Sequence, residues 1–109
     1  AINQFPYGTP FMVFSDEPEK VKEMFNPFSK DPQRNFMFIK GNHYIVDFWL
    51  GTQCKNFIIG NSSYSWWMAW LIKNQDKKII APSTWWTEKA WKEWRYSTKH
   101  LFPDGWVVI

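Results

Sequence analysis

NFIIGNSSYSWWMAWL, residues 56–71, is the stretch of this sequence that decides the fold. Residues 56–60 form a short apolar run with two adjacent isoleucines, which is typical of a buried strand. A polar turn follows, and residues 64–71 are apolar on nearly every side, as in a helix buried on several faces. The stretch therefore predicts a buried strand that enters a helix through a polar turn.

The same alternation of strand and helix extends in both directions along the chain. The other strand-length apolar runs also predict strands covered on both faces. Alternation at this rhythm predicts an α/β fold, a Rossmann-like parallel sheet of about four strands with helices on both faces. The predicted strands are residues 11–14, 36–39, 56–60 and 78–81; the predicted helices are residues 17–28 (ended by Pro27 and Pro32), 43–55, 64–71 and about 87–96, before a tail at 106–109.

Length and composition limit the classes of protein that this chain can represent. The 109 residues predict a single domain, and the thirteen basic and ten acidic residues are scattered without a basic tract, which disfavours nucleic acid as a partner. No run reaches the ~18 apolar residues of a membrane-spanning helix. A single cysteine, Cys54, forms no intrachain disulfide, which fits a reducing compartment. Nine tryptophans indicate either sugar binding or a dense aromatic core.

Ligands of parallel α/β sheets bind beyond the carboxyl ends of the strands, so the residues after each predicted strand are candidate site residues. In the turn after residues 56–60, hydroxyl groups and the free N–H groups of a helix start form a natural site for a phosphate. The alternative is that Asn61, Ser62 or Ser63 only caps the helix. The candidates in this turn are Asn61, Ser62, Ser63 and Ser65.

Carboxylates and tryptophans supply the other candidates. Asp16 follows the first predicted strand and could accept hydrogen bonds from guanine or from ribose hydroxyls, or could cap the next helix. Asp47 lies within a predicted helix, where a carboxylate usually faces solvent. Trp85 and Trp86 follow the last predicted strand and could face a sugar, whereas the tryptophans of residues 66–70 are expected to pack in the core.

The remaining reactive side chains do not form a recognisable site. His43 and His100 are far apart and lack a third ligand at metal spacing, so no metal is expected. Cys54 lies on an apolar helix stripe and is expected to be a core residue rather than a nucleophile. No catalytic residue is assigned from the sequence, and no cofactor is expected.

Residues 44–71, YIVDFWLGTQCKNFIIGNSSYSWWMAWL, resemble the α-1,2-fucosyltransferase family, glycosyltransferase family 11. The shared features are an Asp-led helix, a Cys-Lys pair, an apolar strand, and Asn-Ser-Ser-aromatic-Ser-Trp-Trp before Ala-Trp-Leu. Upstream, VFSDEPEKVKEMF (residues 13–25) looks like the family's Phe-Ser-Asp segment. Downstream, IIAPSTWW and LFPDGWVVI look like its C-terminal end, so the likeness covers most of the chain.

The resemblance implies a two-lobed enzyme whose C-terminal lobe holds GDP-fucose. Asp16 is implied to bind the base, and Ser62 and Ser63 the diphosphate, so the three side chains should meet at one rim of the sheet. Asp47, fifteen positions before Ser62, has a spacing that looks shared with α-1,6 enzymes and is a candidate supporting residue. The implied reaction is metal-free transfer of L-fucose, with inversion, to the 2-hydroxyl of a galactoside in a glycan acceptor.

The sequence departs from the family pattern at three points. The His-X-Arg-Arg-X-Asp motif expected before Phe11 and the acceptor lobe are absent, and Met68 stands where the family usually has Gly. Residues 1–109 are therefore expected to be a partial GDP-sugar-binding lobe of a longer transferase, inactive alone. Its expected partner is the missing N-terminal lobe or, through exposed aromatic residues, a second copy of the chain.

Two other functions remain open from the sequence. The first is a transferase for another linkage or another GDP-sugar, and the second is a non-catalytic, Trp-rich carbohydrate-binding or interaction domain. The compartment also remains open: cytoplasmic or membrane-peripheral for a bacterial or viral protein, and the Golgi lumen for an animal one.

Overall fold

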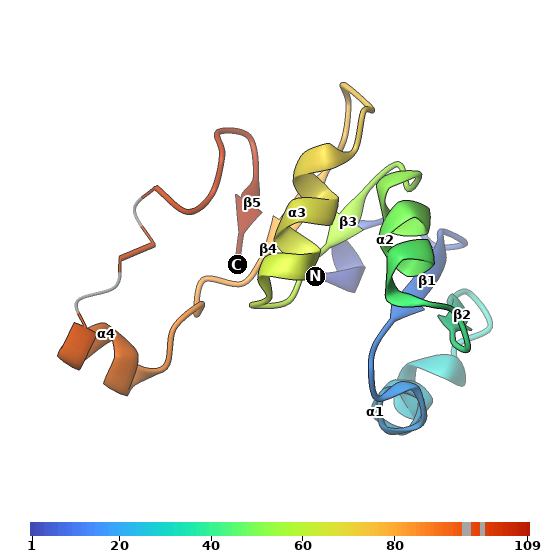
Figure 1. Ribbon diagram of the computed structural model, residues 1–109. Helices are drawn as coiled ribbons and strands as arrows, with labels where there is room; N and C mark the ends of the chain where they lie inside the picture. Colours follow the sequence, from blue (N-terminus) through green and yellow to red (C-terminus); the bar gives the residue numbers. More distant parts are fainter. Residues whose placement is uncertain (95–96, 99) are drawn as a thin grey trace. The chain divides into compact units, whose positions relative to one another are not determined.

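The computed structural model describes residues 1–94, 97–98 and 100–109, and it confirms an α/β fold built on parallel strands (Figure 1). Residues 95 and 96 of the predicted last helix lie outside the described residues. The elements are a 3-10 helix η1 (Ile2–Gln4), β1 (Pro10–Phe14), α1 (Pro18–Ser29), β2 (Asn35–Ile39), α2 (Tyr44–Thr52), β3 (Phe57–Ile58), α3 (Ser63–Leu71), β4 (Ile79–Ala81), α4 (Glu88–Trp94) and β5 (Val107–Val108).

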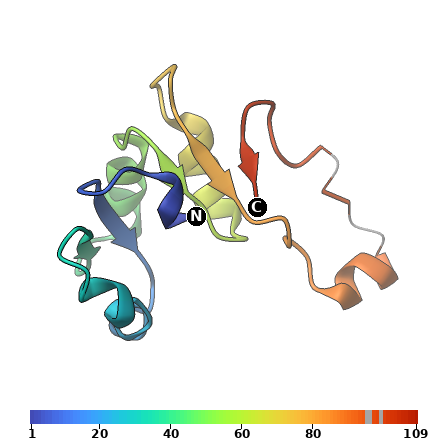
Figure 2. The ribbon, with the colours of Figure 1, turned by 180° about the vertical axis from the view of Figure 1, so that it is seen from behind.

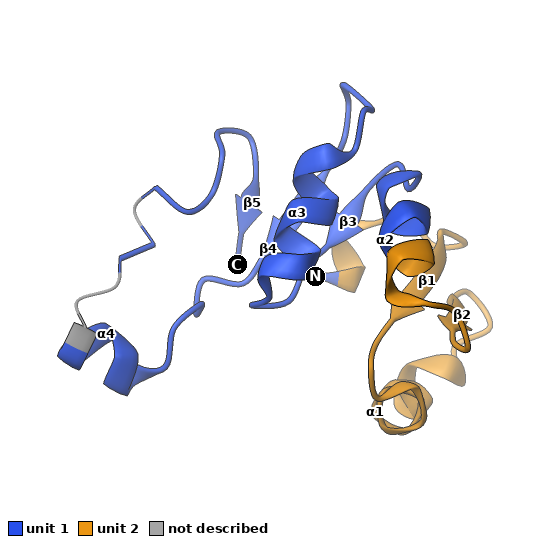
Figure 3. Cartoon of the chain, viewed as in Figure 1, with its two compact units in different colours: residues 1, 48–109 blue, residues 2–47 orange. Residues whose placement is uncertain are grey.

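The chain forms two compact units, which Figure 3 shows in different colours. The N-terminal unit comprises residues 2–47, and the C-terminal unit comprises residues 48–109 with residue 1. A single domain over residues 1–109 stays a prediction.

In the N-terminal unit, β1 and β2 form a parallel pair in which Phe11 is opposite Phe36 and Met12 is opposite Met37. Phe25 of α1 packs against this pair, with its ring 5.1 Å from that of Phe36. The prediction that both faces of these strands are covered is wrong, because Met12 and Met37 are 41% and 60% exposed. The physical reason is that side chains alternate along a strand, and only the phenylalanine face meets α1.

Helix α1 corrects a second prediction, since it runs through Pro27 and ends at Ser29. A proline removes one N–H donor from a helix, but its fixed φ is compatible with helical backbone. The residues around Pro27 are exposed, so solvent can satisfy the carbonyl that lacks its N–H partner. The helix therefore continues past Pro27 and ends one residue later than predicted.

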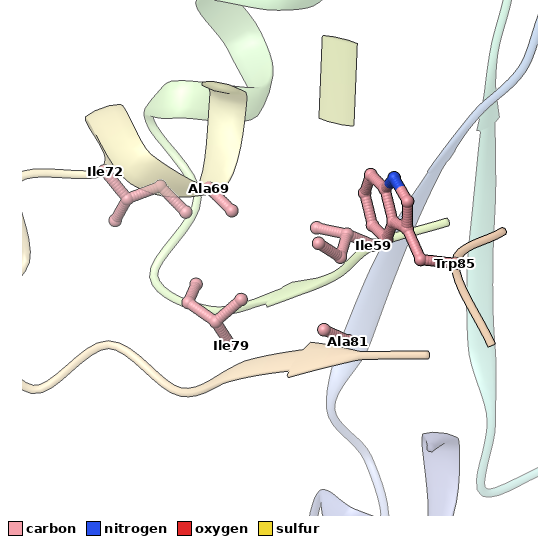
Figure 4. Packing of buried hydrophobic residues seen from close by; sticks show 6 residues of the cluster. All are labelled: Ile59, Ala69, Ile72, Ile79, Ala81 and Trp85. Atoms are coloured by element: carbon pink, nitrogen blue, oxygen red, sulfur yellow. The ribbon is translucent and has the colours of Figure 1, made fainter. Parts of the chain in front are cut away.

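In the C-terminal unit, β3, β4 and β5 form a parallel sheet with β4 in the middle. The predicted tail is thus a fifth strand, in which the Ile109 N–H donates to the carbonyl of Ala81 at 3.0 Å. Helix α3 lies on one face of this sheet (Figures 1 and 2), and β4 is buried throughout. The core between them, drawn in Figure 4, consists of Ile59, Ala69, Ile72, Ile79, Ala81 and Trp85.

Helix α3 is buried on one face rather than on several. Met68 and Ala69 are buried, whereas Trp67 and Trp70 are 53% and 48% exposed, so the prediction that these two tryptophans pack in the core is wrong. A helix on a single sheet face presents one stripe to that sheet, and nothing in the described residues covers the opposite stripe. Trp66 does pack, and its Nε1–H donates to the carbonyl of Leu101 at 2.9 Å.

Candidate functional site

The turn between β3 and α3 presents unengaged hydroxyl groups at the start of a helix. Ser62 occupies the N-cap position with extended backbone, φ −130° and ψ 132°, but its side chain makes no capping hydrogen bond. The capping role considered for Ser62 is therefore wrong in the described structure. Asn61 and Ser63 are also exposed, and within the described residues their side chains form no hydrogen bond. Three polar side chains of this turn are thus available to a ligand.

Ser65 has a different role from the other residues of the turn. Its Oγ donates towards the carbonyl oxygens of Gly60 at 3.2 Å and of Ser62 at 3.0 Å. These bonds join the end of β3 to the first turn of α3, so Ser65 positions the turn. The backbone of Ser62 also accepts the N–H of Trp66 at 3.0 Å, which starts the helical hydrogen bonds. N–H groups earlier in the first turn of a helix lack intrahelical acceptors.

Asp16 follows β1 with an exposed carboxylate. Helix α1 begins at Pro18 with Glu17 at the N-cap, and the Glu17 N–H donates to Ser15 Oγ at 3.0 Å. The capping role considered for Asp16 is therefore wrong. No hydrogen bond or ion pair to the Asp16 carboxylate occurs among the described residues, so it too is available to a ligand.

Asp47 is held in a fixed orientation in the first turn of α2. Its Oδ1 accepts a hydrogen bond from Asn42 Nδ2 at 3.0 Å, and the side chain is half-buried. Asn42 follows β2, and Gly41 before it has φ +80°, a conformation that favours glycine. The sequence reasoning missed this pair, although the Gly-Asn turn after a predicted strand was its signal.

The predicted site residue Asp16 shares an edge of the N-terminal sheet with Asn42, the hydrogen-bond partner of Asp47. Because β1 and β2 are parallel neighbours, Asp16 and Asn42 follow strand ends at the same edge of the sheet. Ser62 and Ser63 belong to the C-terminal unit, where the carboxyl ends of β3 and β4 form the corresponding edge. That Asp16 meets the two serines stays a prediction.

Trp85 lies in the hydrophobic core and is 8% exposed. Figure 4 shows its indole ring beside Ile59, and its ring centroid is 5.6 Å from that of Phe102. This burial favours packing over sugar contact for Trp85. Trp86 is half-buried and packs against the same core, and its contact with sugar stays a prediction.

Cys54 has the environment of a structural thiol. It is half-buried, its Sγ lies 3.7 Å from the carbonyl of Leu50, and burial raises the pKa of the thiol above its ordinary value. A raised pKa disfavours the thiolate that a nucleophile or metal ligand requires. Among the described residues, no three His, Cys, Asp or Glu side chains form a group that could hold a metal ion. That donor binding and transfer need no metal ion remains a prediction.

None of the helices in the described ranges is long and apolar enough to cross a membrane.

A comparison with protein families matches the model described as Glycosyl transferase family 11 over residues 1–109. The chain belongs to glycosyl transferase family 11. The resemblance inferred from the Asn-Ser-Ser-Tyr-Ser-Trp-Trp stretch is thereby confirmed, and so is the glycosyltransferase class. No solved structure gives a significant match.

Two curated relatives of this family 11 chain come from Escherichia coli. One is named alpha-1,2-colitosyltransferase and is 49% identical over 101 residues, which is 91% of this chain and 32% of the relative. The other is named O-antigen biosynthesis glycosyltransferase WbnK and is 38% identical over 101 residues, which is 90% of this chain and 30% of the relative. The chain thus spans about a third of the length of the curated relatives it matches.

Proposed function

We propose that this family 11 chain supplies the GDP-binding part of a transferase that moves L-fucose from GDP-fucose to the 2-hydroxyl of a galactoside, with inversion. The observation that carries the proposal is the turn at Ser62 and Ser63. Serines at a helix start ordinarily cap it, yet Ser62 stands at the N-cap with its hydroxyl unused.

The chemistry of this turn suits a diphosphate. Helix α3 has nine residues, and its dipole places partial positive charge at the end where Ser62 and Ser63 lie. Hydroxyl and N–H donors at such an end bind phosphate oxygens without a cationic side chain. Ser65 holds the turn in place through the carbonyls of Gly60 and Ser62, which reduces the entropy lost on binding.

The exposed carboxylate of Asp16 suits a guanine base. Guanine carries two adjacent donors, N1–H and N2–H, and a carboxylate can accept both. Uracil and adenine lack this pair of adjacent donors, so the contact would select GDP over UDP and ADP. The orientation of Asp47, set by Asn42, supports a role for this carboxylate beside the sugar or the ribose.

The chain by itself is proposed to bind donor without transferring sugar, because its sequence contains no His-X-Arg-Arg-X-Asp motif to stabilise departing GDP. The inverting base and the residues that contact the acceptor are therefore proposed to belong to a longer parent protein.

Titration of the chain with GDP, UDP and free fucose, followed by tryptophan fluorescence, tests the proposal. We expect GDP to bind in preference to UDP, with an affinity unchanged by EDTA. The double substitution Ser62→Ala/Ser63→Ala should weaken GDP binding about ten-fold or more, because it removes two hydroxyl donors to the charged phosphates. Asp16→Asn should weaken it by a similar factor, because it removes the charged acceptor of the two guanine N–H groups.

Matched control variants are available for both substitutions. Ser29→Ala alters an exposed serine at the end of α1, and Asp76→Asn alters an exposed acid in the loop before β4; both should leave GDP affinity unchanged. Binding of free sugar without any preference for GDP would contradict the proposal and favour a Trp-rich carbohydrate-binding domain.

The name of the 49% identical relative favours a second donor, a GDP-linked colitosyl group. Colitose is the 3-deoxy form of L-fucose, so the two donors differ by one hydroxyl. A site that hydrogen-bonds the 3-hydroxyl would reject the deoxy sugar by about 10⁴-fold, whereas an apolar wall there would accept it. Competition between GDP-fucose and GDP-colitose for the chain distinguishes the two donors.

A further inference from the structure

The outer face of α3 is apolar, although the proposed function uses only the N-terminal end of this helix. Trp67, Trp70 and Leu71 recur at i, i+3 and i+4, which places them on one stripe. They are 53%, 48% and 49% exposed, and the buried residues lie on the other side of the helix, where Ala69 packs in the core on the sheet and Met68 faces Gly51 of α2. A helix at the surface of a soluble unit ordinarily has polar residues on that outer stripe.

Lysines lie beside the C-terminal end of this stripe. A hollow of about 330 Å³ lies there between the loop after α2 and the loop after α3, and a second of about 480 Å³ is lined by the end of α3 and the loop after it; Leu71 lines both. The described residues that line them include Lys55, Lys73 and Lys77 and no carboxylate. The Lys77 ammonium donates to backbone carbonyls of the last turn of α3 and of its C-cap, Ile72. Lys55 and Lys73 are exposed, and within the described residues neither forms an ion pair.

This end of the unit is opposite the proposed diphosphate site. The loop after α3 leads into the amino end of β4, whereas Ser62 and Ser63 follow the carboxyl end of β3, and these strands are parallel (Figure 1). A partner bound at the lysines would therefore leave the Ser62–Ser63 turn accessible. The lysine end of the Leu71 side is therefore separate from the proposed donor site.

We propose that Trp67, Trp70, Leu71, Lys55 and Lys73, here called the Trp–Lys face, dock on the surface of a bilayer that contains anionic lipid. Tryptophan rings suit the boundary between headgroups and acyl chains, and leucine adds apolar area. Lysines beside them attract anionic headgroups.

The charge of the Trp–Lys face argues against a second copy of the chain as its partner. A symmetric dimer brings the same patch of each subunit together, so Lys55 and Lys73 would face the same lysines of the partner. An anionic surface complements these charges. The apolar residues also stand on the outside of a helix, which suits a broad surface such as a bilayer.

Co-sedimentation of the chain with vesicles tests this proposal. We expect binding to vesicles of phosphatidylcholine mixed with phosphatidylglycerol, weakened by salt, and little binding to phosphatidylcholine alone. Lys55→Gln and Lys73→Gln should each lower partitioning about five-fold. The double substitution Trp67→Ser/Trp70→Ser should lower partitioning of the chain onto vesicles and remove the blue shift of tryptophan fluorescence on binding. Its GDP affinity should be unchanged.

Helix α4 of the same unit offers matched controls. Trp91 is 60% exposed and Lys89 is exposed, so Trp91→Ser and Lys89→Gln should leave vesicle binding unchanged. Equal binding to neutral vesicles, or equal loss in the α4 variants, would overturn the proposal. Self-association that depends on Trp67 and Trp70 without vesicle binding would assign the face to a second copy. Binding to soluble polyglutamate with the same dependence on tryptophan and lysine would assign it to an acidic protein segment.

Discussion

The sulfur atom of Met68 in α3 occupies the space where a Cβ atom on Gly51 in α2 would lie. Met68 is 2% exposed and Gly51 is buried, so neither residue has free space around it. The family resemblance drawn from the sequence implied a glycine at position 68, where this chain has methionine. The methionine is accommodated because the residue facing it in α2 has no side chain.

A side chain at position 51 should destabilise the chain because it displaces Met68. Overpacking of a buried contact destabilises a protein by about 1–3 kcal/mol, whereas replacing a helical glycine by alanine stabilises the helix by about 1 kcal/mol. We therefore expect Gly51→Ala to lower the free energy of unfolding by about 1 kcal/mol in urea denaturation. In a double-mutant cycle, Gly51→Ala should cost less when Met68 is already alanine; strictly additive effects would show that the two side chains do not compete for this space.

Ser62→Ala should change stability little, because the Ser62 side chain makes no capping bond. We expect a change within about 0.5 kcal/mol in thermal or urea unfolding. Thr87 is the matched control, since its Oγ1 accepts the Ala90 N–H at 3.2 Å at the start of α4. Thr87→Ala should cost about 1 kcal/mol. A similar cost at Ser62 would mean that its hydroxyl caps α3 in solution.

Lys77 should stabilise the C-terminal end of α3. Its Nζ donates to the carbonyls of Ala69, Trp70 and Ile72 at 3.1, 2.9 and 2.9 Å. Lys77→Met keeps most of the aliphatic chain and removes the ammonium, so we expect a loss of about 1–3 kcal/mol. Lys73→Met, at an exposed neighbouring position, should have an effect below about 0.5 kcal/mol. Equal effects of the two substitutions in urea unfolding would argue against stabilisation of the α3 C-terminus by the Lys77 ammonium.

The two adjacent tryptophans Trp66 and Trp67 should differ in their contribution to stability. Trp66 donates to the carbonyl of Leu101 and packs against Trp106, with ring centroids 5.6 Å apart. Trp66→Phe should therefore cost about 1–3 kcal/mol, because the Leu101 carbonyl loses its partner. Trp67→Phe, at a 53% exposed position, should cost about 0.5 kcal/mol or less. Calorimetric unfolding of both variants measures the difference, and a reversed order would contradict the packing described for α3.

Cys54 should make stability depend on alkaline pH. Burial raises the pKa of its thiol above its ordinary value, so the unfolded chain loses this proton at lower pH than the folded chain does. The stabilising contribution is complete below the unfolded pKa and is lost as pH rises through the folded pKa. Urea unfolding from neutral pH to about pH 10.5 should show a smaller decrease in Cys54→Ala than in the parent chain. Parallel decreases in both proteins would contradict a raised pKa.

Prediction from the sequence worked best where neighbouring residues carry the signal. Residues 64–71 were expected as a helix and 78–81 as a strand, each within one residue of the observed α3 (Ser63–Leu71) and β4 (Ile79–Ala81), because apolar spacing and turn residues are local features. The short strand β5 lies in residues 106–109, which were predicted only as a tail. Its pairing depends on β4, whose residues are far from it in the sequence.

Prediction of individual roles was weaker for the candidate site. The residue types in the turn pointed to a phosphate. The pattern could not tell whether the serine hydroxyl caps the helix or is free, because the same residues are compatible with both arrangements. Likewise, Asp47 looked like an isolated surface carboxylate until the turn at Gly41 brought the Asn42 amide to 3.0 Å from it.

The sequence by itself determined membership of the family, the order of the first four strands and the α-helices, and the polar turn at residues 61–65, since each depends on residues adjacent in the chain. Only the tertiary structure decided which tryptophans are buried. Trp85 enters the core beside Ile59, whereas Trp67 and Trp70 stay on the surface of α3. The physical reason is that burial depends on which stripe of a helix meets the sheet, and in an all-apolar helix that choice is made by contacts between residues distant in sequence.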